Sequence, residues 1–321
     1  MKRQIHLDCI SGMLIVHMIM VHISATCDVD YTWEKIILFF YMPWFFFKSG
    51  MFFHHKDTKL CFKSNYHRLL VPFIVFSIIG LIPFWLDLYL REIFDISWYL
   101  SAPKILITNG NFPGNIALWY LLSLFIIKIG YNYFATIKGM WIKLLFLSIS
   151  LSTPIIFYRL TFENIFIPHT FCGLFFFLCG VYLRDIQFKN EVFLFSIIAL
   201  IIMEYISPSA VSIYNNLLEN GIYEMWYPAS LAGIIAINNI AKHLPIKNWI
   251  VQLLSKIGKD SLNYLVTHLI VIHFCKIVIK YFLDNHNPTQ QLFMTMGVCL
   301  IVLPLINKLL NSNRLRFLVG K

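Results

Sequence analysis

The sequence predicts an all-α protein, a polytopic membrane bundle of about ten transmembrane helices. The composition is the first reason: 59% of the 321 residues are hydrophobic and 13% are charged, whereas soluble domains usually carry about a quarter charged residues. The mean hydropathy of +0.70 is the second reason. The third is that long apolar segments recur along the whole chain, with no Pro/Gly/Ser-rich linker between them. We therefore expect a single integral membrane domain over residues 1–321.

Each transmembrane helix needs about 20 largely apolar residues to cross the hydrocarbon core. The first segment that qualifies is not followed by a small-residue cleavage site, which favours a retained span over a removed signal peptide. The seventh is short and the fourth contains Lys128, so these two depart most from an ideal span. Strands are not expected, because open sheet edges cannot lie in lipid. The ten predicted spans are 9–27, 36–53, 69–90, 116–133, 141–158, 165–183, 192–206, 226–241, 262–283 and 292–310.

The distribution of Lys and Arg predicts the orientation of these spans. With the N-terminus in the cytoplasm, the cytoplasmic connections hold 17 of these residues and the outside connections hold 4. Cytoplasmic connections of membrane proteins are enriched in Lys and Arg. We therefore expect both ends of the sequence in the cytoplasm and the lipid bilayer as a partner. The longest outside connections, 91–115 and 207–225, either hold an extracytoplasmic substrate or serve only as links.

Two other function classes receive little support. The net charge of +10 does not indicate nucleic-acid binding, because the basic residues are spread between apolar segments and do not cluster on one polar face. The seven cysteines contain no CxxC pair and are expected to be reduced apolar fillers. No metal is expected either, since His54, His55 and His67 are not accompanied by a Cys or a carboxylate at a familiar zinc spacing.

Polar residues inside a membrane span are costly, so each one is a candidate for function. In the first span, Asp8, Ser11 and His22 follow the three- and four-residue spacing that puts side chains on one helical stripe. His17 points to the opposite side. A neutral imidazole can take a proton from a hydroxyl or carry an acyl group. His22 is therefore a catalytic candidate, with a structural histidine bonded to a neighbouring helix as the alternative.

The second span and the connection after it carry further candidates. Tyr41 and Lys48 are seven residues apart and share a helix face. Lys48 either faces the protein or extends along its aliphatic stem to the interface. Lys63 and Arg68 stand in the basic loop before the third span, where they can bind phosphates of a cytosolic donor or lie beside anionic lipid. In the ninth span, His268 taken alone is more typical of a structural partner than of a catalyst.

Taken together, these motifs resemble the membrane acyltransferase family 3, which includes O-acetyltransferases of bacterial surface polysaccharides and the fucose 4-O-acetylase-like group. The first span has the family's order of Arg3, Asp8, Gly12 and His22. FYMPWFFFKSG in the second span and RLLVPF at the start of the third follow in the family's order. The segments LWYLL and YLVTHL also match, and the resemblance extends over the whole chain in topology.

The resemblance implies an enzyme of the cell membrane, most simply a bacterial inner membrane, that moves an acetyl group from acetyl-CoA to a hydroxyl of a surface polysaccharide or lipid-linked glycan. It implies catalysis by His22, with Asp8 orienting polar groups at the cytoplasmic mouth. Acetyl-CoA is the expected donor, with no metal. Arg68 and Lys63 are the expected donor-phosphate contacts, and Tyr41 and His268 the expected substrate contacts.

Two positions depart from the family pattern. The family has a basic residue, linked to the acyl-CoA donor, eleven positions before the histidine, where this sequence has Ser11. It also commonly has a histidine where this sequence has Tyr41. Lys48 is expected at a depth similar to that of Ser11 on a neighbouring helix, because each lies only a few residues from the cytoplasmic face. We therefore interpret Lys48 as the residue that supplies the positive charge missing at Ser11, with Asp8 as its candidate partner. Lys48 and Ser11 are accordingly grouped with the donor site.

Two alternatives to an active acyltransferase remain at the level of sequence. A secondary transporter or glycan flippase would also be a polytopic helical protein, although transporters often contain internal repeats and this sequence has no second copy of the first-span stripe. A catalytically inactive family member within a glycan assembly complex is the other alternative.

Overall fold

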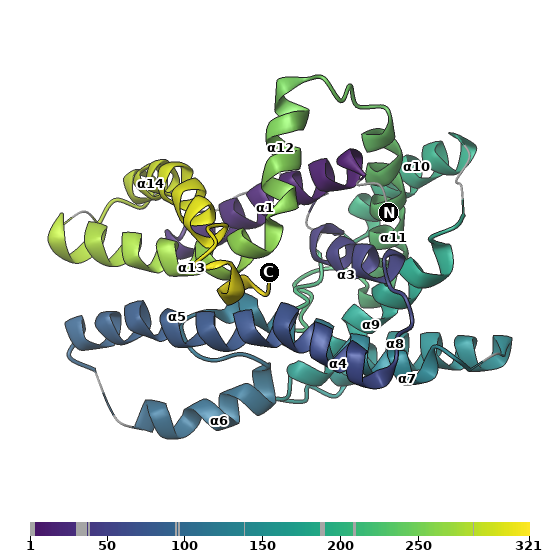
Figure 1. The fold of residues 1–321 in the computed structure, drawn as a ribbon, viewed down its shortest axis with the longest axis horizontal. Coiled ribbons are helices and arrows are strands. Elements are labelled where there is room, and N and C mark those ends of the chain that lie inside the picture. The colour runs from purple at the N-terminus through teal and green to yellow at the C-terminus, as the bar shows by residue number, and fades with distance from the viewer. Residues whose placement is uncertain are drawn as a thin grey trace.

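The computed structural model describes residues 4–29, 37, 39–93, 95, 97–137, 139–186, 190–207, 210–284 and 286–321. The described chain is helical and contains no named strand; an isolated antiparallel bridge joins Ser212 and Leu217. The predicted all-α class is therefore confirmed (Figure 1). The elements are α1 (Ile5–Thr26), α3 (Tyr41–Met51), α4 (Thr58–Asn65), η1 (Tyr66–Leu70), α5 (Val71–Leu90), α6 (Ser97–Asn109), η2 (Ile116–Leu118), α7 (Trp119–Phe134), α8 (Met140–Arg159), α9 (Phe166–Leu183), α10 (Asn190–Ile206), α11 (Tyr223–Lys242), α12 (Trp249–Lys259), α13 (Ser261–Ile277), η3 (Val278–Phe282), α14 (Pro288–Leu310) and η4 (Arg316–Val319).

Seven helices of the described chain are long and apolar enough to cross a membrane. They correspond to α1, α4 through α5, η2 with α7, α8, α9, α13 with η3, and α14. The other three predicted spans coincide with helices that are shorter or more polar. The helix α3 has 11 residues and α10 has 17, while the 20 residues of α11 include Glu224, Asn238, Asn239 and Lys242. The chain is thus a helical membrane bundle.

The helix α3 is short for a local reason. The predicted span 36–53 contains Pro43, which has no backbone N–H and is tolerated in the first turn of a helix but not in its interior. The helix begins at Tyr41, so Pro43 falls within that first turn. Residues 30–36 and 38 of this region lie outside the described residues.

The basic segment before the third span is mostly helical, whereas the sequence predicted a loop. The Asp57 side chain accepts hydrogen bonds from the backbone N–H groups of Lys59 and Leu60, at 3.0 and 3.3 Å, and so caps the start of α4. Asn132 of α7 bonds both the N–H and the carbonyl of Lys56, at 3.1 and 3.0 Å. The helix α4 then continues through the π-helical turn η1 into α5. Lys63 and Arg68 are therefore held on a rigid element.

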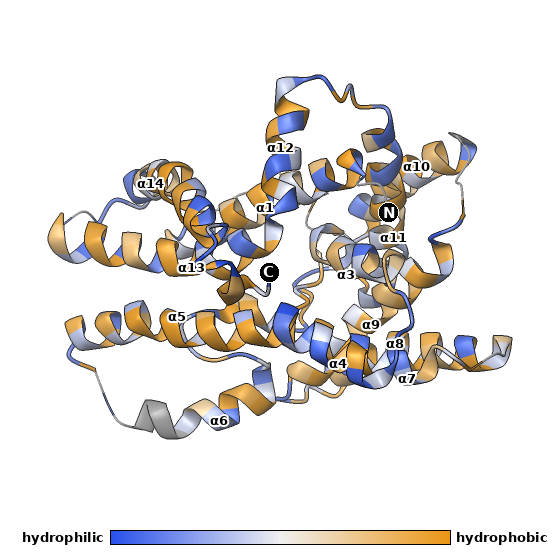
Figure 2. Cartoon of the chain, viewed as in Figure 1, coloured by the Kyte–Doolittle hydropathy of each residue, from blue (hydrophilic) through white to orange (hydrophobic). Residues whose placement is uncertain are grey.

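The bundle buries large aromatic side chains and also exposes many large apolar ones. Trp44, Phe46, Phe176 and Trp226 are among the largest fully buried side chains. Large apolar side chains are also exposed along α5, α8, α10 and α14, and Figure 2 shows how hydrophobic α5 and α14 are along their length. Exposed apolar surface of this extent is not typical of a soluble monomer and fits contact with lipid.

Candidate active site

A cationic cluster joins α1 and α3 near the end of the bundle that the Lys/Arg distribution assigns to the cytoplasm. The Lys48 Nζ donates to the Ser11 Oγ at 2.5 Å and to the Leu7 carbonyl oxygen at 3.5 Å. It lies 3.8 Å from a carboxylate oxygen of Asp8 and 5.2 Å from the centre of the Trp44 ring. The Lys48 and Asp8 side chains are 22% and 15% exposed. This cation is therefore compensated by groups of the protein itself.

Close helix crossings fix the position of this cluster. Gly258 of α12 lies against the α1 backbone, where an added methyl group would overlap the Asp8 carbonyl oxygen, and Gly12 meets the α12 backbone in the same way. The Ser255 Oγ adds a hydrogen bond to the Ile5 carbonyl oxygen at 3.1 Å. Since neither glycine position tolerates a Cβ, α12 holds the start of α1 at a defined depth.

Two histidines from different helices lie side by side farther along α1. The ring centres of His22 and His268 are 5.1 Å apart, with 42° between the ring planes. His268 is fully buried, and its Nδ1 lies 3.0 and 2.9 Å from the carbonyl oxygens of Tyr264 and Leu265. Because a carbonyl oxygen only accepts, Nδ1 carries the proton, and Nε2 is the acceptor of the neutral ring. That Nε2 has no hydrogen-bond partner among the described residues.

His17 and Tyr41 form a separate contact. Their ring centres are 5.4 Å apart, with the rings nearly perpendicular at 73°. His17 is buried, on a different side of α1 from His22, as the helical spacing predicts. Tyr41 was expected to contact substrate, and the ring contact described for it is with His17.

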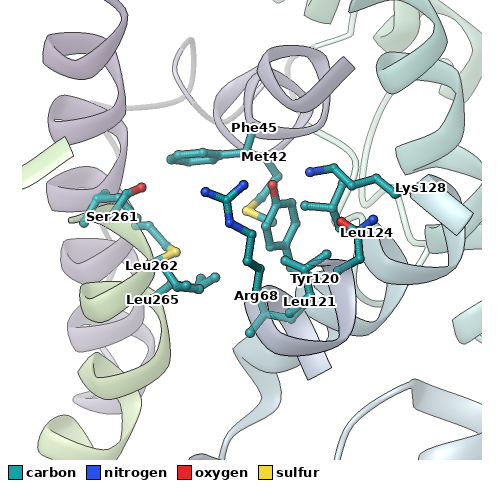
Figure 3. A pocket seen from close by; sticks show the side chains of 14 residues that line it. Met42, Phe45, Arg68, Tyr120, Leu121, Leu124, Lys128, Ser261, Leu262 and Leu265 are labelled. Atoms are coloured by element: carbon teal, nitrogen blue, oxygen red, sulfur yellow. The ribbon is translucent and has the colours of Figure 1, made fainter. Parts of the chain in front are cut away.

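A cavity of about 220 Å³ lies between α1, α3, η1, α7 and α13. Figure 3 shows the guanidinium of Arg68 and the amine of Lys128 pointing into it from two elements, with the Tyr120 hydroxyl between them. Its walls are otherwise largely apolar, and no carboxylate of the described residues lines it. The lining residues are Ile15, Met18, Met42, Phe45, Asn65, Arg68, Leu69, Tyr120, Leu121, Leu124, Lys128, Ser261, Leu262 and Leu265.

The cavity and the histidine pair are one helical turn apart on both helices. Met18 lines the cavity and His22 follows it by four residues on α1. Leu265 lines the cavity and His268 follows it by three residues on α13. Residues three and four apart lie on the same helix face. The cavity and the two imidazoles therefore lie in succession along the same faces of α1 and α13.

The expected site residues divide into three places. Asp8, Ser11 and Lys48 form the cationic cluster, while His22 and His268 form the imidazole pair. Arg68 lines the cavity, but Lys63 is exposed on α4 and does not belong to its lining within the described chain.

Lys128 is the site residue that the sequence reasoning missed. In the sequence it stands out only as a departure from an ideal fourth span, although a lysine about six residues inside an apolar helix is itself a functional signal. Tyr120, which also lines the cavity, was noted only as part of the LWYLL segment. Its hydroxyl lies 3.5 Å from the Ser49 Oγ.

Apolar helices and a cation-lined cavity beside two imidazoles define a membrane-embedded protein with a candidate active site. Comparison with protein families identifies it further: the model of an acyltransferase domain matches residues 5–314. The chain belongs to the membrane acyltransferase family 3 and is a membrane acyltransferase, as the motifs predicted. Comparisons with curated proteins and with solved structures find no match. Within the described residues, no group of three or more His, Cys, Asp or Glu side chains is arranged to hold a metal ion.

Proposed function

We propose that this acyltransferase moves an acetyl group from cytosolic acetyl-CoA to a sugar hydroxyl of a surface polysaccharide or of a lipid-linked glycan. The observation that carries the proposal is a cavity lined by two cations, with two imidazoles one helical turn beyond its lining residues on α1 and α13. A thioester donor with a polyphosphate head matches both features.

The two cations supply the donor site. Arg68 and Lys128 have no ion-pair partner among the described residues, and no acid lines the cavity that they enter. Charge-assisted hydrogen bonds to phosphate are among the strongest that proteins form, and a guanidinium can bind phosphate oxygens in pairs. We assign the donor's phosphates to Arg68 and Lys128, and its pantetheine arm to the apolar wall that includes Met18 and Leu265.

The histidine pair supplies the chemistry. The acceptor hydroxyl oxygen attacks the thioester carbonyl carbon, and His22 takes the hydroxyl proton as general base. The carbon–sulfur bond then breaks, and the proton is returned to the leaving thiolate, so that the products are the acetyl ester and free coenzyme A. The Nε2 acceptor of His268 is suited to orient His22 by accepting a hydrogen bond from its imidazole.

Lys48 takes the place of the basic residue that the family has at position 11. Its hydrogen bond to Ser11 and its proximity to Asp8 support this assignment. We propose that this cation sets the electrostatic potential at the cytoplasmic mouth, with Asp8 orienting it. The departures at Ser11 and Tyr41 are then compatible with an active enzyme.

The orientation belongs to the same proposal: both ends of the sequence lie in the cytoplasm, so that Arg68 and Lys128 face the donor. Reporter fusions after Lys63, Lys256 and Lys321 should report cytoplasm, and fusions after Lys104 and Glu219 should report the outside. A cytoplasmic signal at Glu219 would contradict the assignment of α11 as a span.

The activity is tested by structural analysis of surface glycan from cells with and without the gene. The proposal expects ester-linked acetyl groups to be lost without the gene and restored by the wild-type gene but not by a His22→Ala gene. Unchanged acetylation would contradict the glycan acceptor. Purified protein in liposomes, given acetyl-labelled acetyl-CoA and the same glycan, then tests the transfer directly.

A further inference from the structure

A second and larger cavity lies on a different face of α1. Its volume is about 730 Å³, within the range of small-molecule binding sites. It is formed by α1, α12, α13 and α14, which contact one another in one half of the molecule (Figure 1). On α1 it is lined by Val16, Ile19 and Met20, whereas the active-site cavity uses Ile15 and Met18. We call this second cavity the α1–α14 groove.

One end of the groove is apolar and open toward the surrounding lipid. On α14 the wall includes Leu300, Leu303 and Pro304, which recur at helical spacing on one face. Leu300 is 75% exposed, so the groove is accessible from the side of the bundle and not only from its end. From Leu300 to Pro304 and along the facing residues of α1, the wall extends for several ångströms without a charged residue.

The other end of the groove is polar and positively charged. Lys256 of α12 and Lys308 of α14 both line it, both are exposed, and neither forms an ion pair with a described residue. The carboxylate of Asp260 also lies there, but it already accepts from the Lys321 Nζ at 2.8 Å and from the Asn311 amide at 3.0 Å. Two lysines thus remain for an external anion.

We propose that the α1–α14 groove is a binding site for one anionic phospholipid of the leaflet on the Lys256 side. Its phosphate lies between Lys256 and Lys308, and one acyl chain follows the wall of Ile19, Met20 and Leu300. Charge complementarity selects an anionic headgroup at the polar end, and the apolar wall excludes a water-soluble anion as the natural occupant. The site is separate from the donor cavity and does not depend on the proposed acetyl transfer.

The experiment uses the purified full chain in detergent with a phosphatidylglycerol that carries a photoreactive diazirine in its acyl chain. After irradiation, peptide mapping should find the label on residues 16–23 and 296–305. The double variant Lys256→Gln with Lys308→Gln should bind roughly thirtyfold more weakly, since the two lysines near an anionic lipid contribute on the order of 1 kcal/mol each. The matched control, Lys59→Gln with Lys63→Gln, removes the same charge from exposed positions on α4 and should bind normally.

A filling variant tests the apolar wall without changing charge. Leu300→Trp should reduce labelling, whereas Leu309→Trp, at an exposed α14 position outside the lining, should not. Unlabelled phosphatidylglycerol should compete far better than phosphatidylcholine. The proposal would be overturned by equal competition from the two lipids or by an equal loss of lipid binding in the two lysine double variants. Labelling spread evenly over other lipid-facing helices would also overturn it. Stronger competition by a polyprenyl phosphate than by phosphatidylglycerol would do so too, because it would identify a different occupant.

Discussion

The bundle holds two kinds of cation at its predicted cytoplasmic end, and they differ in their partners. Lys48 is bonded to Ser11 and the Leu7 carbonyl and lies near Asp8, so its charge is largely compensated inside the protein. Arg68 and Lys128 enter a cavity whose lining contains no carboxylate. A charge that is paired at rest organises its surroundings, whereas unpaired charges in a cavity attract an anion from outside. We therefore propose that Lys48 positions neighbouring groups and that Arg68 and Lys128 bind the donor.

The largest effect is expected at the imidazole of His22, which belongs neither to the Lys48 cluster nor to the lining of the cavity. If the cavity leads the donor to His22, His22→Ala should lower the acetyl-transfer rate by on the order of 10²–10⁴, the usual effect of removing a general base. The change should appear in the turnover number in liposomes that contain correctly inserted protein. His17→Ala is the matched control, because His17 contacts Tyr41 on another side of α1. Equal activity of the His22 variant and wild type would exclude this mechanism.

The next effect distinguishes the two cations that line the cavity, Arg68 and Lys128, from Lys63, which does not. Lys128→Gln and Arg68→Gln should each raise the KM for acetyl-CoA by roughly tenfold or more, because a hydrogen bond to a charged group contributes about 1.5–3 kcal/mol. The turnover number should change less. Lys63→Gln removes a nearby exposed charge and should leave the KM within about twofold of wild type. If neither Arg68→Gln nor Lys128→Gln raises the KM above that of Lys63→Gln, these two cations do not bind the donor.

A smaller effect is expected at the paired cation. Lys48→Met should lower activity by about tenfold, since it leaves Asp8 and Ser11 without the charge-assisted contacts that Lys48 makes. The double variant Lys48→Met with Ser11→Arg returns a cation to the position that the family uses, and should recover part of the activity. Normal acylation by Lys48→Met would instead make this residue an interfacial anchor.

The sequence predicted the local features of this protein better than the long-range ones. The one-stripe spacing of Asp8, Ser11 and His22 and the similar depth of Ser11 and Lys48 follow from helix geometry alone, and the observed Lys48–Ser11 hydrogen bond agrees with that depth. The inward direction of Lys128 was not predictable, because it depends on how α7 is rotated against η1 and α13. The helix α12 was not predictable either, because it lies in a predicted connection. It nevertheless holds α1 in place through Gly258.

The pairing of His22 with His268 also lies beyond single-sequence reasoning. Each histidine was recognised as a candidate, but 246 residues separate them, and hydrophobic spacing does not specify which spans are neighbours. The helical character of residues 58–65 was missed for a different reason. The polar composition suggested a loop, while the Asp57 cap and the continuation into α5 stabilise a helix there.

The smallest expected effect concerns a second paired cation, Lys321, which forms an ion pair with Asp260. Burial alone would raise the pKa of Asp260, but the hydrogen bond and charge of Lys321, with the amides of Asn307 and Asn311, outweigh burial and lower this pKa. A carboxyl group whose pKa is lowered by folding contributes stability above its unfolded-state pKa and loses it as the pH falls through its folded-state pKa. Lys321→Met should therefore destabilise the protein at neutral pH by less than about 1 kcal/mol, because Lys321 is partly exposed.

The difference between the variant and wild type in the midpoint of thermal unfolding should vanish as the pH falls below the Asp260 pKa. Acetyl-CoA KM should stay unchanged throughout, since this pair lies outside the donor cavity. A rise in KM on losing Lys321 would show that a paired cation can also serve the donor, and would break the distinction between the two kinds of cation.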